Sequence, residues 1–174
     1  MVSFDAIPFE IGEWTILRLP ESASAALPSR GMTVVEGTMN GFRSKFVLEP
    51  DGKGSHWFQV DPGLRESAGI HTGVPVTMTV EPSKELPEPE VPADLSEALE
   101  GEPQANALWQ IITPMARWDW IRWIRATNNP QTRSRRIAVA LSKLNAGSRR
   151  PCCFNRNQCT EPEVSKNGVL IEPL

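Results

Sequence analysis

A stretch rich in proline and glutamate divides the chain into two parts that follow different patterns. Residues 81–92 contain four prolines and four glutamates. Proline interrupts a helix because it lacks a backbone N–H and its ring clashes with the preceding turn, and this stretch has few apolar side chains to bury. We therefore expect residues 82–92 to be an extended, exposed linker that follows an N-terminal domain of residues 1–81.

The first 81 residues consist of short β-rich runs separated by turn signals. The strongest signal is Asn40-Gly41 between the runs 33–39 and 42–48, because the type I′ turn of a two-residue hairpin needs positive φ at both central residues. Pro75 in a later run indicates an edge or the start of a strand. Repeated short strands of this kind are typical of a small β-barrel or sandwich. The other expected elements are strands at 14–19, 56–60 and 74–80 and a turn or short helix at 62–68.

Beyond the linker, the apolar residues follow a helical period. Pro103 and Pro130 suit the first turn of a helix, Asn128-Asn129 supplies a cap, and Gly147 suits the position after a helix end. We expect a helical domain at 93–147, an irregular cysteine-containing tail at 148–174, and helices at 94–99, 104–112, 115–127 and 131–146. The expected fold class is therefore α+β, with an N-terminal small β-barrel and a C-terminal helical domain.

Charge is distributed unevenly along the chain. Residues 1–102 contain 7 basic and 17 acidic residues, a net charge of −10, whereas residues 103–174 have a net charge of +7 and four of the six tryptophans. Guanidinium groups bind phosphates and carboxylates through a planar fork, and tryptophan rings stack on bases or lie at a lipid interface. The basic region is therefore a candidate anion- or partner-binding face, formed by Arg122, Arg125, Arg133, Arg135, Arg136 and Lys143.

A structural interpretation of the same residues stays open. The tryptophans suit the core of a small domain, and the arginines suit a solvated face or a contact with the acidic N-terminal domain. The spacing of the third helix separates charged from apolar residues, with Asp119, Arg122 and Arg125 opposite Trp120, Trp123 and Ile124. In the fourth helix, Arg133, Arg136 and Lys143 lie away from the apolar stripe of Ile137, Leu141 and Leu144.

The residue types that usually carry catalysis are scarce. The chain has no tyrosine and two histidines, His56 and His71, for which we expect structural roles. Cys152, Cys153 and Cys159 lack the paired spacing and the fourth ligand of a structural zinc site. Residues 52–55 suit a β-turn better than a phosphate loop, because no helix follows them. We therefore expect no catalytic residues, no metal and no cofactor.

Several runs resemble known bacterial domains. Residues 123–126, 132–137 and 147–150, with Leu144, resemble the helical module of the YdeI/OmpD-associated, or bacteriocin-protection, proteins. Residues 48–57, 69–73 and 91–99 resemble the uncharacterised barrel domain that often precedes this module. The resemblance implies a double-split β-barrel, similar in plan to swapped-hairpin transcription-factor barrels, and a link to tolerance of bacteriocins or antimicrobial peptides. It implies no catalytic residues and no role for the tail.

These observations favour a non-enzymatic bacterial binding or stress-tolerance protein whose basic helical face contacts an anionic partner, a protein or a peptide. The alternative is a nucleic-acid-binding protein with a transcription-factor-like barrel, and an enzyme of unknown reaction is third. The start of the chain lacks the basic and apolar stretches of a secretion signal, and no run approaches the length of a membrane span. We expect a cytoplasmic monomer with no transmembrane segment.

Overall fold

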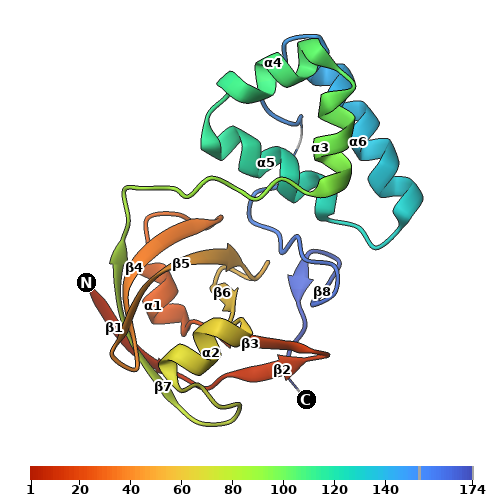
Figure 1. Ribbon diagram of the computed structural model, residues 1–174. Helices are drawn as coiled ribbons and strands as arrows, with labels where there is room; N and C mark the ends of the chain where they lie inside the picture. Colours follow the sequence, from red (N-terminus) through yellow and green to blue (C-terminus); the bar gives the residue numbers. More distant parts are fainter. Residues whose placement is uncertain (153, 174) are drawn as a thin grey trace. The chain divides into compact units, whose positions relative to one another are not determined.

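The computed structural model describes residues 1–152 and 154–173, which form two compact units (Figure 1). The first, here called the sheet unit, contains Met1–Glu85, Arg156–Cys159 and Val164–Leu174. The second, here called the helical unit, contains Leu86–Asn155 and Thr160–Glu163. The tail that the sequence marks at 148–174 is therefore divided between the two units.

A curled antiparallel sheet, open as a half-barrel, forms the sheet unit (Figure 1). Its strand order is β1-β7-β4-β5-β6-β3-β2, so β1 and β2 are the edges. The strands are β1 (Val2–Ala6), β2 (Phe9–Ile11), β3 (Trp14–Arg18), β4 (Thr33–Met39), β5 (Phe42–Pro50), β6 (His56–Gln59) and β7 (Val76–Pro82). Two short helices, α1 (Glu21–Ala25) and α2 (Pro62–Ala68), complete it. The expected α+β class, with a β domain before a helical domain, is confirmed.

The central hairpin forms where the sequence predicts it. Asn40 and Gly41 have φ values of 48° and 84°, and β4 pairs with β5 on either side of them. Gly37 lets β7 approach β4, because a Cβ at this position would lie 1.9 Å from the backbone oxygen of Thr79. Pro75 directly precedes β7, an inner strand, so its predicted strand-start position is correct. The sheet packs around a core that includes Leu17, Val35, Met39, Phe46, Phe58, Met78 and Val80.

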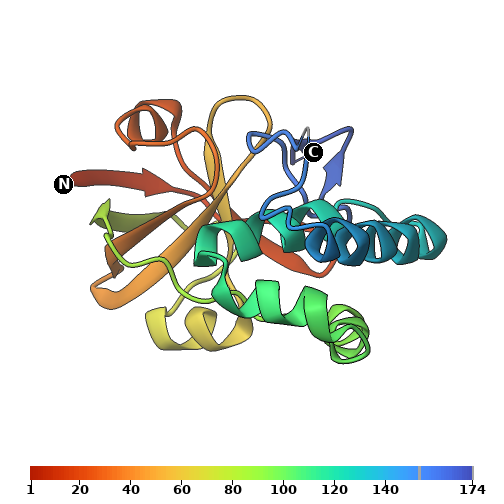
Figure 2. The same ribbon diagram turned by 90° about the horizontal axis from the view of Figure 1, so that it is seen from above.

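Four helices form the helical unit, each within two residues of the predicted bounds: α3 (Ala93–Glu100), α4 (Pro103–Ile111), α5 (Pro114–Arg125) and α6 (Pro130–Asn145). The Asn129 side chain caps α6 by accepting from the backbone N–H groups of Gln131 and Thr132. Helix α6 packs against the other three helices (Figure 2). The predicted core role of the tryptophans is confirmed for Trp109 and Trp120, which are buried.

The second half of the proline-rich stretch is extended but attached to the helical unit. Pro89 is buried, and Leu86 and Val91 are half-buried. The indole N–H of Trp118 donates to the backbone oxygen of Pro87 at 2.8 Å. Residues 86–92 therefore differ from the exposed linker that composition suggests, because a few hydrogen bonds and apolar contacts are sufficient to hold an extended segment.

The tail contains a short hairpin that the sequence reading treats as irregular. Strands β8 (Ser165–Lys166) and β9 (Val169–Leu170) have two residues each and turn at Asn167 and Gly168, which both have positive φ. Cys159, Val164 and Leu170 pack with Ile16 and Trp57 of the sheet in a separate core cluster. Across residues 1–152 and 154–173, no helix is both long and apolar enough to cross a membrane.

Candidate functional site

Helix α5 buries charged residues that the sequence places on a solvated side. Arg122 is 1% exposed, and its guanidinium carbon lies 5.5 Å from the centre of the Phe154 ring. Asp119 is 2% exposed, and its Oδ2 lies 3.9 Å from Nη1 of Arg150. The segment after α6 covers this side of the helix, as the Phe154 ring beside Arg122 and the Arg150 guanidinium beside Asp119 show. The expected solvent exposure is thus wrong for Asp119 and Arg122, and Arg122 presents no external surface.

Arg125, at the end of α5, forms polar contacts with Thr160–Glu163, the short segment of the tail that belongs to the helical unit. Its Nη1 lies 3.0 Å from a carboxylate oxygen of Glu161, and its Nε donates to the Thr160 hydroxyl at 3.2 Å. The Arg125 side chain is mostly buried by these contacts. This residue therefore holds the returning tail in place.

Two of the candidate arginines on α6 join helices. Arg133 donates from Nε and Nη2 to the two carboxylate oxygens of Asp94 on α3, at 2.6 and 3.0 Å. This bidentate pair lowers the pKa of Asp94 and raises that of Arg133. Arg136 donates to the backbone oxygen of Trp123 at 2.8 Å, and its guanidinium lies over the Trp123 ring at 5.6 Å.

The remaining two candidates, Arg135 and Lys143, are exposed. Val139, 38% exposed, lies between them at four-residue intervals, so the three side chains follow one line along the outside of α6. We call these three residues the α6 stripe. Within the part of the chain that the structure describes, no carboxylate forms an ion pair with either cation. Of the six predicted residues, the structure brings only these two together on an accessible face.

The charge asymmetry along the chain does not follow the division into units. The helical unit contains nine acidic and nine basic residues, whereas the sheet unit contains twelve and nine. Residues 86–102 contribute six of the acidic residues and no lysine or arginine. These acids lie in the same unit as the arginines of α5 and α6, and two of them pair with Arg117 and Arg133. The helical unit is therefore electrically balanced, with local rather than overall basic character.

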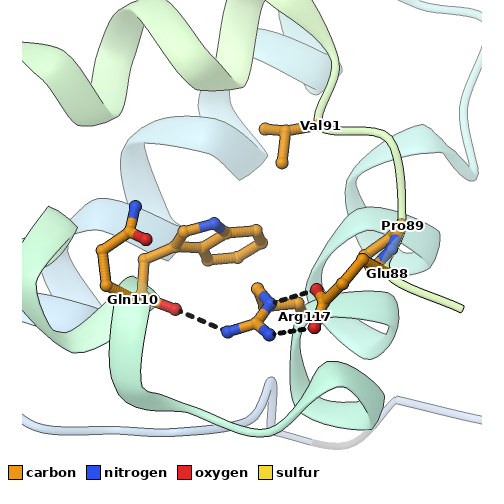
Figure 3. Close-up of a pocket in the computed structure, with 6 residues that line it drawn as sticks. Glu88, Pro89, Val91, Gln110 and Arg117 are labelled. Carbon is orange, nitrogen blue, oxygen red and sulfur yellow. Dashed lines mark hydrogen bonds and ion pairs between the residues drawn. The ribbon is translucent and has the colours of Figure 1, made fainter. Parts of the chain in front are cut away.

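A pocket of about 380 Å³ in the helical unit contains an arginine that was not among the predicted site residues. It is lined by Glu88, Pro89, Val91, Trp109, Gln110 and Arg117. In Figure 3 the Arg117 guanidinium faces the Glu88 carboxylate, with Val91 and Gln110 on other sides of the pocket. Because Glu88 precedes Arg117 by 29 residues, no local spacing could indicate this pair.

The histidine-containing cluster of the sheet unit is buried. His56 Nδ1 lies 2.5 Å from the Ser24 hydroxyl and Nε2 lies 2.8 Å from the backbone oxygen of Gly31. Burial lowers the pKa of His56 below its ordinary value of 6.5, so the ring is neutral at pH 7. Ser24 and His56 are both fully buried, a position that agrees with the structural role expected for His56. His71, in contrast, is exposed.

The structure also shows the surroundings of the loop at residues 52–55 and of two of the three cysteines. The Asp51 carboxylate accepts hydrogen bonds from the backbone N–H groups of Lys53 and Ser55, so the glycine-containing loop is a turn closed by its own side chain. Cys152 is exposed and Cys159 is buried. Cys153 lies outside the described residues.

Comparison with known families agrees with the resemblance seen in the sequence. Residues 88–147 match the family described as bacteriocin-protection, YdeI or OmpD-associated, and residues 6–80 match the domain of unknown function DUF1905. No curated protein matches the chain. The chain therefore has a DUF1905 domain followed by a domain of the bacteriocin-protection family.

Proposed function

We propose that this protein is a non-enzymatic binding protein that takes part in tolerance of bacteriocins or antimicrobial peptides, and that the α6 stripe contacts its anionic partner. The association with bacteriocin protection comes from the family of residues 88–147. The observation that supports the binding surface is the exposure of Arg135 and Lys143 on one line of α6 while the other four predicted residues contact their own unit.

The dimensions of the α6 stripe define the kind of contact it can make. Eight residues of helix separate the two cations, a distance of about 12 Å along the axis. Val139 adds an apolar contact between them. A surface with two cations and one apolar side chain suits acidic groups on a protein or peptide. It is small for a nucleic acid, whose binding usually depends on many simultaneous phosphate contacts.

The test combines charge reversal with a matched control. The variant Arg135→Glu/Lys143→Glu changes the charge by four and should leave the melting temperature nearly unchanged, because exposed substitutions usually cost no more than about 0.5 kcal/mol. A bacterial strain that lacks the gene and expresses this variant should be as sensitive to the bacteriocin or peptide as the strain without the protein. The control is Arg43→Glu/Lys166→Glu, an equal charge change at exposed positions of the sheet unit.

Two results would contradict the proposal. One is full tolerance with a folded stripe variant; the other is an equal loss of tolerance in the control. Fluorescence anisotropy with a labelled single-stranded 20-mer, repeated between low and high salt, separates the nucleic-acid alternative. Binding that is lost steeply with salt and absent in the stripe variant would favour that alternative.

A further inference from the structure

The hydrogen bonds of Arg117 go to two kinds of partner. On one side, Nη1 donates to the backbone oxygens of Trp109 and Ile112, at 3.1 and 2.7 Å. On the other side, Nε and Nη2 donate to the two carboxylate oxygens of Glu88, at 3.0 and 2.6 Å. Figure 3 shows the two contacts between the Arg117 guanidinium and the Glu88 carboxylate.

The backbone partners hold the guanidinium in place without help from Glu88. The last carbonyl groups of a helix have no partner within it, so Arg117 satisfies two oxygens at the end of α4. Arg117 itself lies in the first turns of α5, whose start is held by Thr113 accepting from the N–H of Ala116. The Nε and Nη2 edge is therefore oriented in advance for a carboxylate, which reduces the entropic cost of binding one.

Glu88 is the replaceable member of the pair. Its side chain is 61% exposed, whereas that of Arg117 is 14% exposed. It lies in an extended stretch between Pro87 and Pro89, outside any helix or strand. A carboxylate from another molecule could take its two hydrogen bonds while Trp118 still holds the neighbouring Pro87.

The rest of the pocket defines the body of the ligand. Pro89, Val91 and the Trp109 side chain line the pocket, Gln110 supplies an exposed amide that can donate and accept, and most of the accessible lining is polar. The volume of about 380 Å³ suits a molecule the size of one acylated amino acid. The combination of an arginine fork, an amide and a mostly polar lining matches the carboxylate and amide groups of an N-acylated amino acid or of the C-terminal residue of a peptide.

We propose that this pocket is a binding site for such carboxylates and that Glu88 is its internal competitor. The site shares no residue with the α6 stripe and goes beyond the function proposed above. Glu88 occupies the fork from within the same chain, so its removal strengthens the binding of an external carboxylate by the closing equilibrium of the internal pair; a tenfold gain corresponds to a pair worth about 1.4 kcal/mol.

The test uses the full chain and a defined probe, N-acetyl-L-phenylalanine, followed by the backbone amide shifts of Trp109 and Gln110 in NMR titrations. Glu88→Gln keeps the size of the side chain but removes its charge, and should bind the probe about tenfold more tightly than the original protein. Glu90→Gln is the matched control, because Glu90 is exposed and two residues away. It should bind like the original protein.

N-acetyl-L-phenylalanine amide is the same probe without the carboxylate charge, and it separates carboxylate recognition from apolar contact. It should cause no saturable changes in the amide chemical shifts of any variant. The proposal is overturned if Glu88→Gln and Glu90→Gln bind the acid equally, or if the amide binds as well as the acid. In Glu88→Gln/Arg117→Lys, the tighter binding should disappear, because a lysine offers no planar fork. Dispersed amide spectra report whether each variant is folded.

Discussion

The two units handle their buried polar groups differently. In the sheet unit, the buried His56 ring bonds with the Ser24 hydroxyl and the Gly31 backbone oxygen, and the buried Asp51 carboxylate lies 3.3 Å from Arg18 Nε, whose side chain is partly exposed. In the helical unit, two charged residues, Asp119 and Arg122, are buried on α5. A third, Arg133 of α6, forms an ion pair with Asp94 of α3. The sheet unit thus buries a histidine that is neutral at pH 7 beside one carboxylate, whereas the helical unit buries a guanidinium as well as a carboxylate on a single helix.

This difference explains why overall charge is a poor guide to the surface of the helical unit. Its basic residues are numerous, but many of them are structural contacts inside the unit. A buried ion pair is costly to break, because removing one partner leaves the other charge uncompensated. The expected effects of substitution therefore differ between the units in size, in pH dependence and in salt dependence.

The largest effect is expected at Arg122. Arg122→Met keeps much of the volume but removes one of the two charges buried on α5 and its contact with the Phe154 ring, and should lower the stability of the helical unit by about 4 kcal/mol. Asp119→Asn/Arg122→Met should recover part of this loss, since both charges are then absent. Denaturant unfolding gives the free energies, and hydrogen exchange of the sheet amides should stay unchanged. A loss below 1 kcal/mol would mean that the helical unit does not depend on this charge.

The next effect tests whether the tail is an integral part of the sheet unit. Leu170→Ala should cost about 3 kcal/mol, because Leu170 is buried against the sheet with Ile16 and Trp57. The matched control is Ile171→Ala, one residue further on at an exposed position, and should change stability by less than about 0.5 kcal/mol. Equal effects of the two variants would show that the hairpin does not contribute to the sheet core.

A smaller effect is expected from pH in the sheet unit. The native state keeps His56 neutral, while the unfolded chain binds a proton at its ordinary pKa of 6.5. Stability from this group is therefore complete above pH 6.5 and decreases as the pH falls below it. Thermal melts between pH 7.5 and 5 should show this decrease, and His56→Gln should flatten it. In the exposed control His71→Gln, the decrease should remain.

The smallest effect is expected from the pair that joins α3 and α6. Arg133→Ala and Asp94→Ala should each cost about 1 kcal/mol or less, since both side chains are partly exposed. The lowered pKa of Asp94 means that its contribution is present above its ordinary pKa of 3.8 and is lost as the pH falls through the lowered value. A double-mutant cycle at low and high salt measures the coupling, which should decrease with salt. A coupling that salt does not change would contradict a screened, partly exposed pair.

Local signals in the sequence predict much of the fold. Asn40-Gly41, the Asn129 cap with Pro130, and Gly147 act within a few residues of themselves, and the structure has each of them where expected. The sequence patterns did not predict three short elements, namely the edge strands β1 and β2 and helix α1. Asn167-Gly168 carried the same hairpin signal as Asn40-Gly41, but its two-residue strands are too short to show a period.

The candidate site was less predictable, because helical spacing shows which residues share a side of α5 but not what covers that side. The segment after α6 covers Arg122 and Asp119, and Glu161 reaches Arg125 from a distant part of the chain. Similarly, Glu88 and Arg117 are 29 residues apart, and Asp94 and Arg133 are 39 residues apart. No periodic pattern connects such positions.

The sequence by itself determined the elements of this protein and their order, because turns, caps and apolar periods depend on neighbouring residues. Only the tertiary structure decided which charges remain at the surface. It attached residues 86–92 to the same unit as the arginines, left Arg135 and Lys143 exposed, and placed Arg117 at a pocket beside Glu88. Charge pairing depends on distance in space, and that distance is set by packing rather than by position along the chain.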